Sequence, residues 1–307
     1  MSELKAKGKD LTKEEEDTRN EYFPYKHIPI REPGPNILEI GFPGNGKTHA
    51  IASLLKAGLE VFVIFTEQGR ESLLEGLETF KCTEEERSRL HWTMIETASP
   101  GFAALGQIAR KINQSNQKAL AGMDDIAGNK YQQALKLINT CANYTDQNGE
   151  EYGDVSTWGN DRALVVDGLS GVNDMMMDLV VGGKPVKSKA DWQIAMDAEM
   201  RFIKQLCNDT RCILVMTGHL DREQDEVTGK ITVTPSLLGT KNGTKIGRLF
   251  SDVLYCTKEA GKFVWYTEDS SNEQLKTRNL DVKKKSHPQS FVPLIERWAG
   301  RYGSAPK

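Results

Sequence analysis

The feature that most constrains this fold is a glycine-rich segment between a short apolar run and an amphipathic one. It reads Gly41-Phe-Pro-Gly-Asn-Gly-Lys-Thr48 and fits the pattern G-x-x-x-x-G-K-[ST]. Residues 37–40 before it resemble a buried strand, and residues 46–56 have helical spacing. Glycines let the backbone curl so that N–H groups and the start of the helix face an anion. The segment therefore predicts a phosphate-binding loop rather than an ordinary glycine-rich turn.

Each polar position of this glycine-rich loop has a role in a triphosphate site. Lys47 is expected to reach the β- and γ-phosphate oxygens, and the Thr48 hydroxyl is expected to hold Mg²⁺. ATP with Mg²⁺ is the ligand that these groups suit. The residues predicted to bind the nucleotide are Gly41, Pro43, Gly44, Asn45, Gly46, Lys47, Thr48 and His49.

Apolar runs alternate with amphipathic stretches along the rest of the chain, as in βαβ units. This alternation predicts an α/β fold with a mostly parallel central sheet flanked by helices. After the loop, strands are expected at 61–65, 91–95, 163–166 and 212–216, and helices at 71–80 and 190–206. Beyond residue 220 we expect β-hairpins, with strands at 231–233, 253–257, 263–267 and 274–280.

The chain divides into three expected parts. Residues 1–30 are charged and poor in apolar side chains, which predicts a flexible arm. Residues 31–282 are expected to form the main domain, with a polar helical insertion at about 101–160, and residues 283–307 a basic tail. The run from Met175 to Met177 is expected to serve core or interface packing.

Composition excludes several classes of protein. No run approaches the ~18 to 20 apolar residues that a bilayer span requires, and the charged N-terminus is unlike a secretory signal, so a cytoplasmic location is expected. The five cysteines contain no Cys-x-x-Cys pair, which argues against zinc binding and disulfides. Because the net charge is −3, any nucleic-acid binding must come from local basic clusters.

Polar side chains follow three of the expected buried strands. Asp167 follows one and suits the Mg²⁺ water shell, although an Asp-Gly pair can also simply start a turn. Glu67 follows another and is the candidate base for the attacking water, or else a solvated residue favoured by the next helix dipole. His219, with Thr217, ends a third strand and could sense the γ-phosphate.

The order of these pieces resembles the RecA-like ATPase core. Further short matches are Asp191-Trp192, Val215-Met-Thr-Gly-His-Leu220, Thr234-Pro-Ser-Leu-Leu-Gly239 and Phe250-Ser-Asp-Val-Leu-Tyr255. With these matches the chain is similar to bacteriophage AAA-family ATPases related to RecA, a group that includes single-strand annealing recombinases. The resemblance covers about residues 36–280.

This resemblance implies an ATPase that assembles into a ring or filament with shared active sites. It implies that Glu67 activates water, that His219 is the sensor and that Asp167 holds the metal. Lys276 and Arg278 match a Lys-x-Arg pair that reaches into the neighbouring subunit, where it would neutralise charge on the γ-phosphoryl group. An exposed charge pair on an edge strand is the alternative.

The resemblance also implies contact with single-stranded DNA through two segments, 182–189 and 221–245. Their lysines suit a phosphate backbone, but the second segment also carries four opposing acids. Another basic patch is offered by Lys283 to Lys285 with Arg297 and Arg301. The function expected is thus an ATPase acting on single-stranded DNA in phage recombination or replication. A DNA translocase or helicase, and an assembly ATPase without DNA, remain alternatives.

Overall fold

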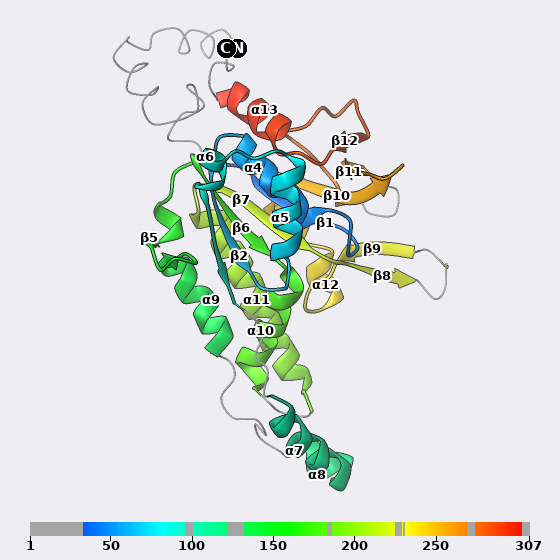
Figure 1. The fold of residues 1–307 in the computed structure, drawn as a ribbon. Coiled ribbons are helices and arrows are strands. Elements are labelled where there is room, and N and C mark those ends of the chain that lie inside the picture. The colour runs from blue at the N-terminus through cyan, green and yellow to red at the C-terminus, as the bar shows by residue number, and fades with distance from the viewer. Residues whose placement is uncertain are drawn as a thin grey trace, which may run out of the picture.

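The computed structural model describes residues 33–95, 101–121, 132–182, 186–224, 229, 231–268 and 274–302, so the arm expected at 1–30 lies outside it. The fold is α/β, built on an eight-stranded sheet (Figure 1). Its strands in spatial order are β12 (Ser286–Pro288), β11 (Lys262–Tyr266), β10 (Asp252–Glu259), β1 (Asn36–Ile40), β7 (Ile213–Gly218), β6 (Arg162–Asp167), β2 (Glu60–Phe65) and β3 (Leu90–Met94). The strands from β10 to β3 are parallel and β11 and β12 are antiparallel, which confirms the mostly parallel sheet.

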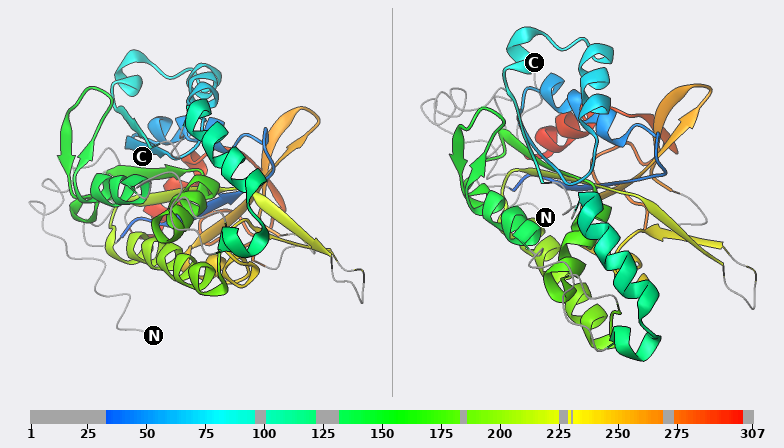
Figure 2. Two further views of the ribbon diagram at one scale, coloured as in Figure 1. Left: turned by 90° about the horizontal axis from the view of Figure 1, so that it is seen from below. Right: turned by 60° about the horizontal axis from the view of Figure 1, so that its bottom comes forward.

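The side chains of each central strand point alternately to the two faces of the sheet, and each face carries its own core. Val61 and Val63 of β2 enter one core, whereas Phe62 and Ile64 enter the other. The first core is covered by α3 (Lys47–Ala50), α4 (Ala52–Lys56), α5 (Arg70–Thr79) and α13 (Val292–Tyr302), with α6 (Glu84–Arg87) beside α4. The second is covered by α9 (Gln132–Ala142), α10 (Leu169–Val181) and α11 (Lys189–Asp209), as the views in Figure 2 show. Helices thus flank both faces.

The region at 101–160 is only partly a helical layer. α7 (Gly101–Gln114) and α8 (Gln117–Ala121) extend away from the sheet (Figure 1), and α9 packs on α10. The remainder forms a hairpin of β4 (Tyr144–Thr145) and β5 (Glu151–Gly153), followed by η1 (Val155–Thr157). The buried rings of Tyr144 and Trp158 pack against Phe62, so this remainder belongs to the core. Met175 to Met177 lie on α10 in the same core, as expected.

Two expectations for the C-terminal part are wrong. No strand forms at 274–280, where the structure has one isolated bridge between Lys276 and Val253. The buried Asp252 carboxylate accepts hydrogen bonds from the backbone N–H groups of Arg278 and Asn279, which curls this segment into a turn. The described part of the expected basic tail, residues 283–302, packs on the domain, because β12 joins the sheet and α13 buries Leu294 in the core.

A separate two-stranded hairpin projects from the body (Figure 2), made of β8 (Leu220–Gln224) and β9 (Ile231–Pro235). It is followed by α12 (Thr240–Gly243) and η2 (Ile246–Leu249). Hairpins after residue 220 were expected, and β8 with β9 and β10 with β11 confirm them. None of the helices in the described ranges is long and apolar enough to cross a membrane.

Candidate functional site

The glycine-rich loop joins β1 to α3 at the carboxyl end of the strand. Gly44 and Gly46 have φ angles of +75° and +84°, a left-handed conformation that favours glycine. A Cβ atom at Gly46 would also lie 2.6 Å from the Phe263 ring and from the Gln289 side chain. Ile51 has helical angles (φ −53°, ψ −37°) and links α3 to α4, so the expected helix at 46–56 is present with a slight irregularity.

Residues distant in sequence hold this loop from behind. Gln289 Nε2 donates to Asn45 O and to Val264 O, both at 2.9 Å, and so ties the loop to β11. The Asn45 side chain donates to Cys256 O of β10 at 3.1 Å, and Gly41 N donates to Gly218 O of β7 at 3.1 Å. These hydrogen bonds support the loop conformation from behind.

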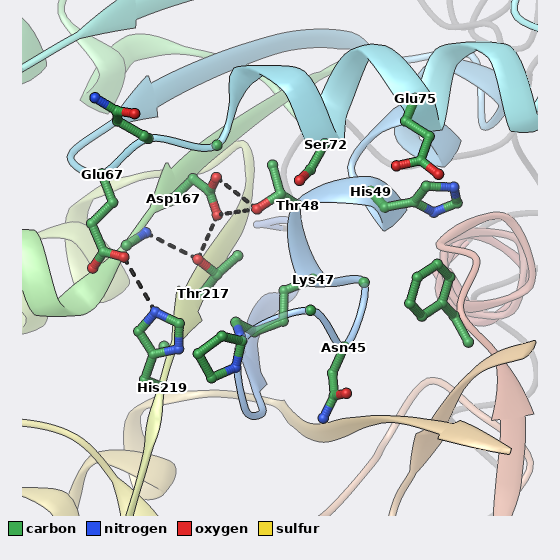
Figure 3. Close-up of a pocket in the computed structure, with 18 of the residues that line it drawn as sticks. Asn45, Lys47, Thr48, His49, Glu67, Ser72, Glu75, Asp167, Thr217 and His219 are labelled. Atoms are coloured by element: carbon green, nitrogen blue, oxygen red, sulfur yellow. Dashed lines mark hydrogen bonds and ion pairs between the residues drawn. The ribbon is translucent and has the colours of Figure 1, made fainter. Parts of the chain in front are cut away.

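A cavity of about 430 Å³ opens in front of the loop, between the carboxyl ends of β2, β6 and β7 (Figure 3). It brings together most of the predicted site residues. Those that line it are Pro43, Gly44, Asn45, Gly46, Lys47, Thr48, His49, Glu67, Asp167 and His219. Gly41 lies at the base of the loop, where it accepts a hydrogen bond from Lys47.

Thr48, Asp167 and Thr217 form a chain of oxygen atoms at the cavity floor. The Thr48 hydroxyl donates to Asp167 Oδ2 at 2.9 Å, and the Thr217 hydroxyl donates to Asp167 Oδ1 at 2.6 Å. Burial raises the pKa of Asp167, and the hydrogen bonds from the two threonines partly offset this rise. β7 lies between β1 and β6, so Thr217 sits between the loop and the aspartate.

The Lys47 side chain folds back over the loop. Its ammonium group donates to Gly41 O at 2.8 Å and to Phe42 O at 3.2 Å. Burial lowers the pKa of Lys47, whereas the nearby Cys256, Glu39, Asp167 and Glu67 raise it. Two carbonyl oxygens at the start of the loop therefore hold the ammonium group of Lys47, and an anionic ligand can replace them.

Glu67 and His219 meet at one end of the cavity (Figure 3). His219 Nε2 lies 3.2 Å from Glu67 Oε2, and the backbone N–H of Gly171 donates to Glu67 Oε1 at 3.0 Å. Burial would raise the pKa of Glu67, but these hydrogen bonds together bring that pKa below its usual value. Glu67 is thus an ionised acceptor at neutral pH.

The opposite end of the cavity combines the predicted His49 with four side chains that the sequence did not predict. The His49 ring lies 5.0 Å from the Phe263 ring, and Lys258 Nζ lies 4.6 Å from the centre of that ring. Ser72 and Glu75 of α5 complete this end. Ser72 and Glu75 stand three residues apart on the helix that follows Glu67, which is a signal that could have found them. Lys258 and Phe263 carry no such signal, because only the register of β10 with β11 pairs them.

A buried acid, Glu39, lies behind the loop in β1 and was also missed. Trp265 Nε1 donates to its Oε1 atom at 2.8 Å, and Oε2 has no hydrogen-bond partner among the described residues. Burial raises the pKa of Glu39 from 4.5 to about 8. A lone acid inside an apolar strand was the available sequence signal.

Lys276 and Arg278 do not join this cavity. Lys276 forms an isolated antiparallel β-bridge with Val253 of β10. Val253 in turn pairs with Leu38 of β1, which precedes the loop. Arg278 lines a different hollow, at the edge of the sheet where β1 begins. Within one chain, these two cations therefore lie at the far end of the strands from the loop.

The cavity can hold an anion at the loop and present a carboxylate opposite it. Among the described residues no group of three His, Cys, Asp or Glu side chains forms a metal cluster. The hydroxyl of Thr48 and the carboxylate of Asp167 are nevertheless hard oxygen ligands, which suit Mg²⁺ when phosphates and water supply the remaining ligands.

No protein-family model matches this sequence, and no curated protein matches it.

Proposed function

We propose that this protein binds and hydrolyses ATP with Mg²⁺ in the cavity in front of the glycine-rich loop. The observation that carries the proposal is the convergence of Lys47, Thr48 and Asp167 on one cavity. A lysine, a hydroxyl and a buried carboxylate beside left-handed glycines are the groups that a metal-bound triphosphate requires. The match of the loop to G-x-x-x-x-G-K-[ST] supports the same conclusion.

The roles of the binding residues follow from their positions. The backbone N–H groups of the loop surround the phosphates, and Lys47 exchanges its carbonyl partners for phosphate oxygens. Thr48 and Asp167 would hold Mg²⁺, which supplies positive charge to the phosphates when bound. The far end of the cavity, with Phe263, His49 and Glu75, leaves room for a nucleoside beyond the phosphates.

Glu67 would accept the proton of the attacking water, because it is ionised and faces the cavity opposite the loop. His219 orients this carboxylate through the contact at 3.2 Å and is placed to respond when the γ-phosphate leaves. Thr217 positions Asp167 through its short hydrogen bond.

The wider proposal is a RecA-like ATPase that acts on single-stranded DNA as a ring or filament. Its support is the resemblance in motif order together with the mostly parallel sheet. Since Lys276 and Arg278 lie at the other end of the strands, they would act on the nucleotide of a neighbouring copy, as a head-to-tail assembly allows. Of the lysines in the two candidate DNA segments, Lys184 and Lys230 lie outside the described residues, whereas Lys187, Lys189 and Lys245 are exposed.

Two variants test the nucleotide site directly. Lys47→Ala should weaken ATP binding by roughly 100-fold, because a charge-assisted hydrogen bond contributes up to about 3 kcal/mol. Glu67→Gln should leave ATP binding intact and slow hydrolysis by about 10² or more. Lys204→Ala and Glu85→Gln are matched controls, because both residues are exposed and lie outside the cavity. Unchanged ATP affinity in Lys47→Ala would disprove the binding site, and unchanged turnover in Glu67→Gln would remove Glu67 from the mechanism.

A further inference from the structure

A second hollow, which we name the arginine pocket, lies at the edge of the sheet opposite the glycine-rich loop. Its volume is about 260 Å³, and its walls come from the chain before β1, from η2, from the turn after residue 276 and from α13. Arg248, Arg278 and Arg301 all line it, although they are distant from one another in sequence. None of the described residues that line it is acidic.

The carboxylate of Asp252, which follows the lining residue Ser251, is already fully hydrogen-bonded. Asp252 is completely buried and accepts hydrogen bonds from Arg278 N at 2.9 Å and Asn279 N at 3.0 Å. It also accepts from Asn279 Nδ2 at 2.7 Å and from the hydroxyls of Thr277 and Ser251, both at 2.6 Å. These bonds fix the turn, so Asp252 holds this segment in place through the backbone N–H groups of Arg278 and Asn279 and does not pair with the guanidinium group.

Positive charge is therefore concentrated at this edge of the sheet. Within the part of the chain that the structure describes, Arg248, Arg278 and Arg301 form no ion pair. The pKa of the neighbouring Lys276 is lowered, first by burial and then by the charge of Arg278. In a chain whose net charge is −3, such a cluster is a local feature that an anion would stabilise.

We propose that the arginine pocket binds the phosphate groups of a single nucleic-acid strand. Guanidinium groups bind phosphate in a bidentate manner, and several of them around one hollow suit a ligand with repeated phosphates. Arg248 and Arg301 line this concavity together with Arg278, so they carry the proposal independently of the role of Arg278 at a neighbouring nucleotide. This inference rests on the DNA-binding part of the proposed function and places that binding at a site separate from the nucleotide cavity.

The test uses Arg248 and Arg301, because Arg278 is already assigned to the subunit interface. The double variant Arg248→Gln with Arg301→Gln is compared with wild type for binding of a labelled single-stranded oligonucleotide between 50 and 200 mM salt. Loss of two phosphate contacts should reduce the slope of log K against log salt by about 1.4 and weaken binding at low salt by roughly tenfold or more. Arg110→Gln, an exposed arginine on α7, is the control for charge alone. ATP binding, measured in parallel, should not change.

Three results would overturn the proposal. Wild-type protein that binds no oligonucleotide would refute it and would leave the ATPase proposal standing. If log K of the double variant depended on log salt with the same slope as log K of Arg110→Gln, the pocket would bind no phosphates. Intact oligonucleotide binding with lost ATP hydrolysis in the double variant would assign the pocket to the nucleotide of a neighbouring copy. Loss of ATP binding alone concerns the glycine-rich loop and is tested by Lys47→Ala.

Discussion

Replacing Glu39 by glutamine should change how the stability of this protein depends on pH. Glu39 is completely buried in β1, and its Oε1 atom accepts a hydrogen bond from Trp265. Burial raises its pKa from 4.5 to about 8. At pH 7 the folded protein therefore keeps this proton, whereas the unfolded chain loses it. The stability that the protonated group contributes is complete below pH 4.5 and is lost as the pH rises toward 8.

The magnitude follows from the pKa of the folded state. Each pH unit between the two pKa values lowers the free energy of unfolding by about 1.4 kcal/mol, which amounts to roughly 3 kcal/mol at pH 7. Glutamine does not titrate, so Glu39→Gln removes this dependence. Its amide adds buried N–H groups beside a position without an acceptor, a cost that does not vary with pH. The variant should thus gain on wild type by roughly 2 to 3 kcal/mol between pH 5 and pH 7.

Urea unfolding followed by tryptophan fluorescence at pH 5, 6, 7 and 8 measures this gain. Other buried acids contribute to both proteins, including Glu199, whose pKa burial raises to about 7, so only the difference between variant and wild type is read. The exposed Glu85→Gln variant controls for loss of one carboxylate. A difference that stays constant within about 0.5 kcal/mol from pH 5 to pH 8 would refute the reasoning, because Glu39 would then ionise as it does in the unfolded chain.

Two further predictions concern the nucleotide site. Subunits carrying Arg278→Ala or Lys47→Ala should each be inactive alone and should partly recover ATP hydrolysis when mixed. The reason is that a mixed interface can pair an intact loop with an intact Arg278. No recovery at any mixing ratio would contradict a shared site. Removing Mg²⁺ with a chelator should weaken ATP binding by roughly tenfold or more, since the triphosphate would then face the carboxylates of Asp167 and Glu67 without a divalent cation. Titration calorimetry with and without chelator measures this change, and equal affinities would contradict the prediction.

The parts of the fold that were predictable depend on local sequence. Buried strands such as β2 and β6 are short apolar runs, and the glycine-rich loop combines all its signals within eight residues. Glu67, Asp167 and His219 were found because parallel strands bring their carboxyl ends to one edge of a sheet. That rule needs no knowledge of strand order.

The parts that were missed depend on distant contacts. α10 has apolar side chains on most of its surface, because the sheet and α11 both pack on it, and so it shows no single apolar stripe. The turn at 277–279 replaces an expected strand because of one carboxylate, Asp252, that precedes it by 25 residues or more. Phe263 and Gln289 reach the loop only through the pairing of β11 with β10 and β12.

These distant contacts also surround Glu39, an acid that lies behind Lys47 of the glycine-rich loop. An ionised Glu39 would attract Lys47 and compete with the phosphates for its charge. Burial keeps Glu39 protonated at neutral pH, although the hydrogen bonds from Trp265 and Cys256 of the β10–β11 hairpin favour its ionised form. The same hairpin supplies Phe263 and Lys258 to the cavity, and Gln289 fastens it to the loop. The loop motif alone therefore does not define the surroundings of Lys47, because residues more than 200 positions later in the chain contact Glu39 behind it.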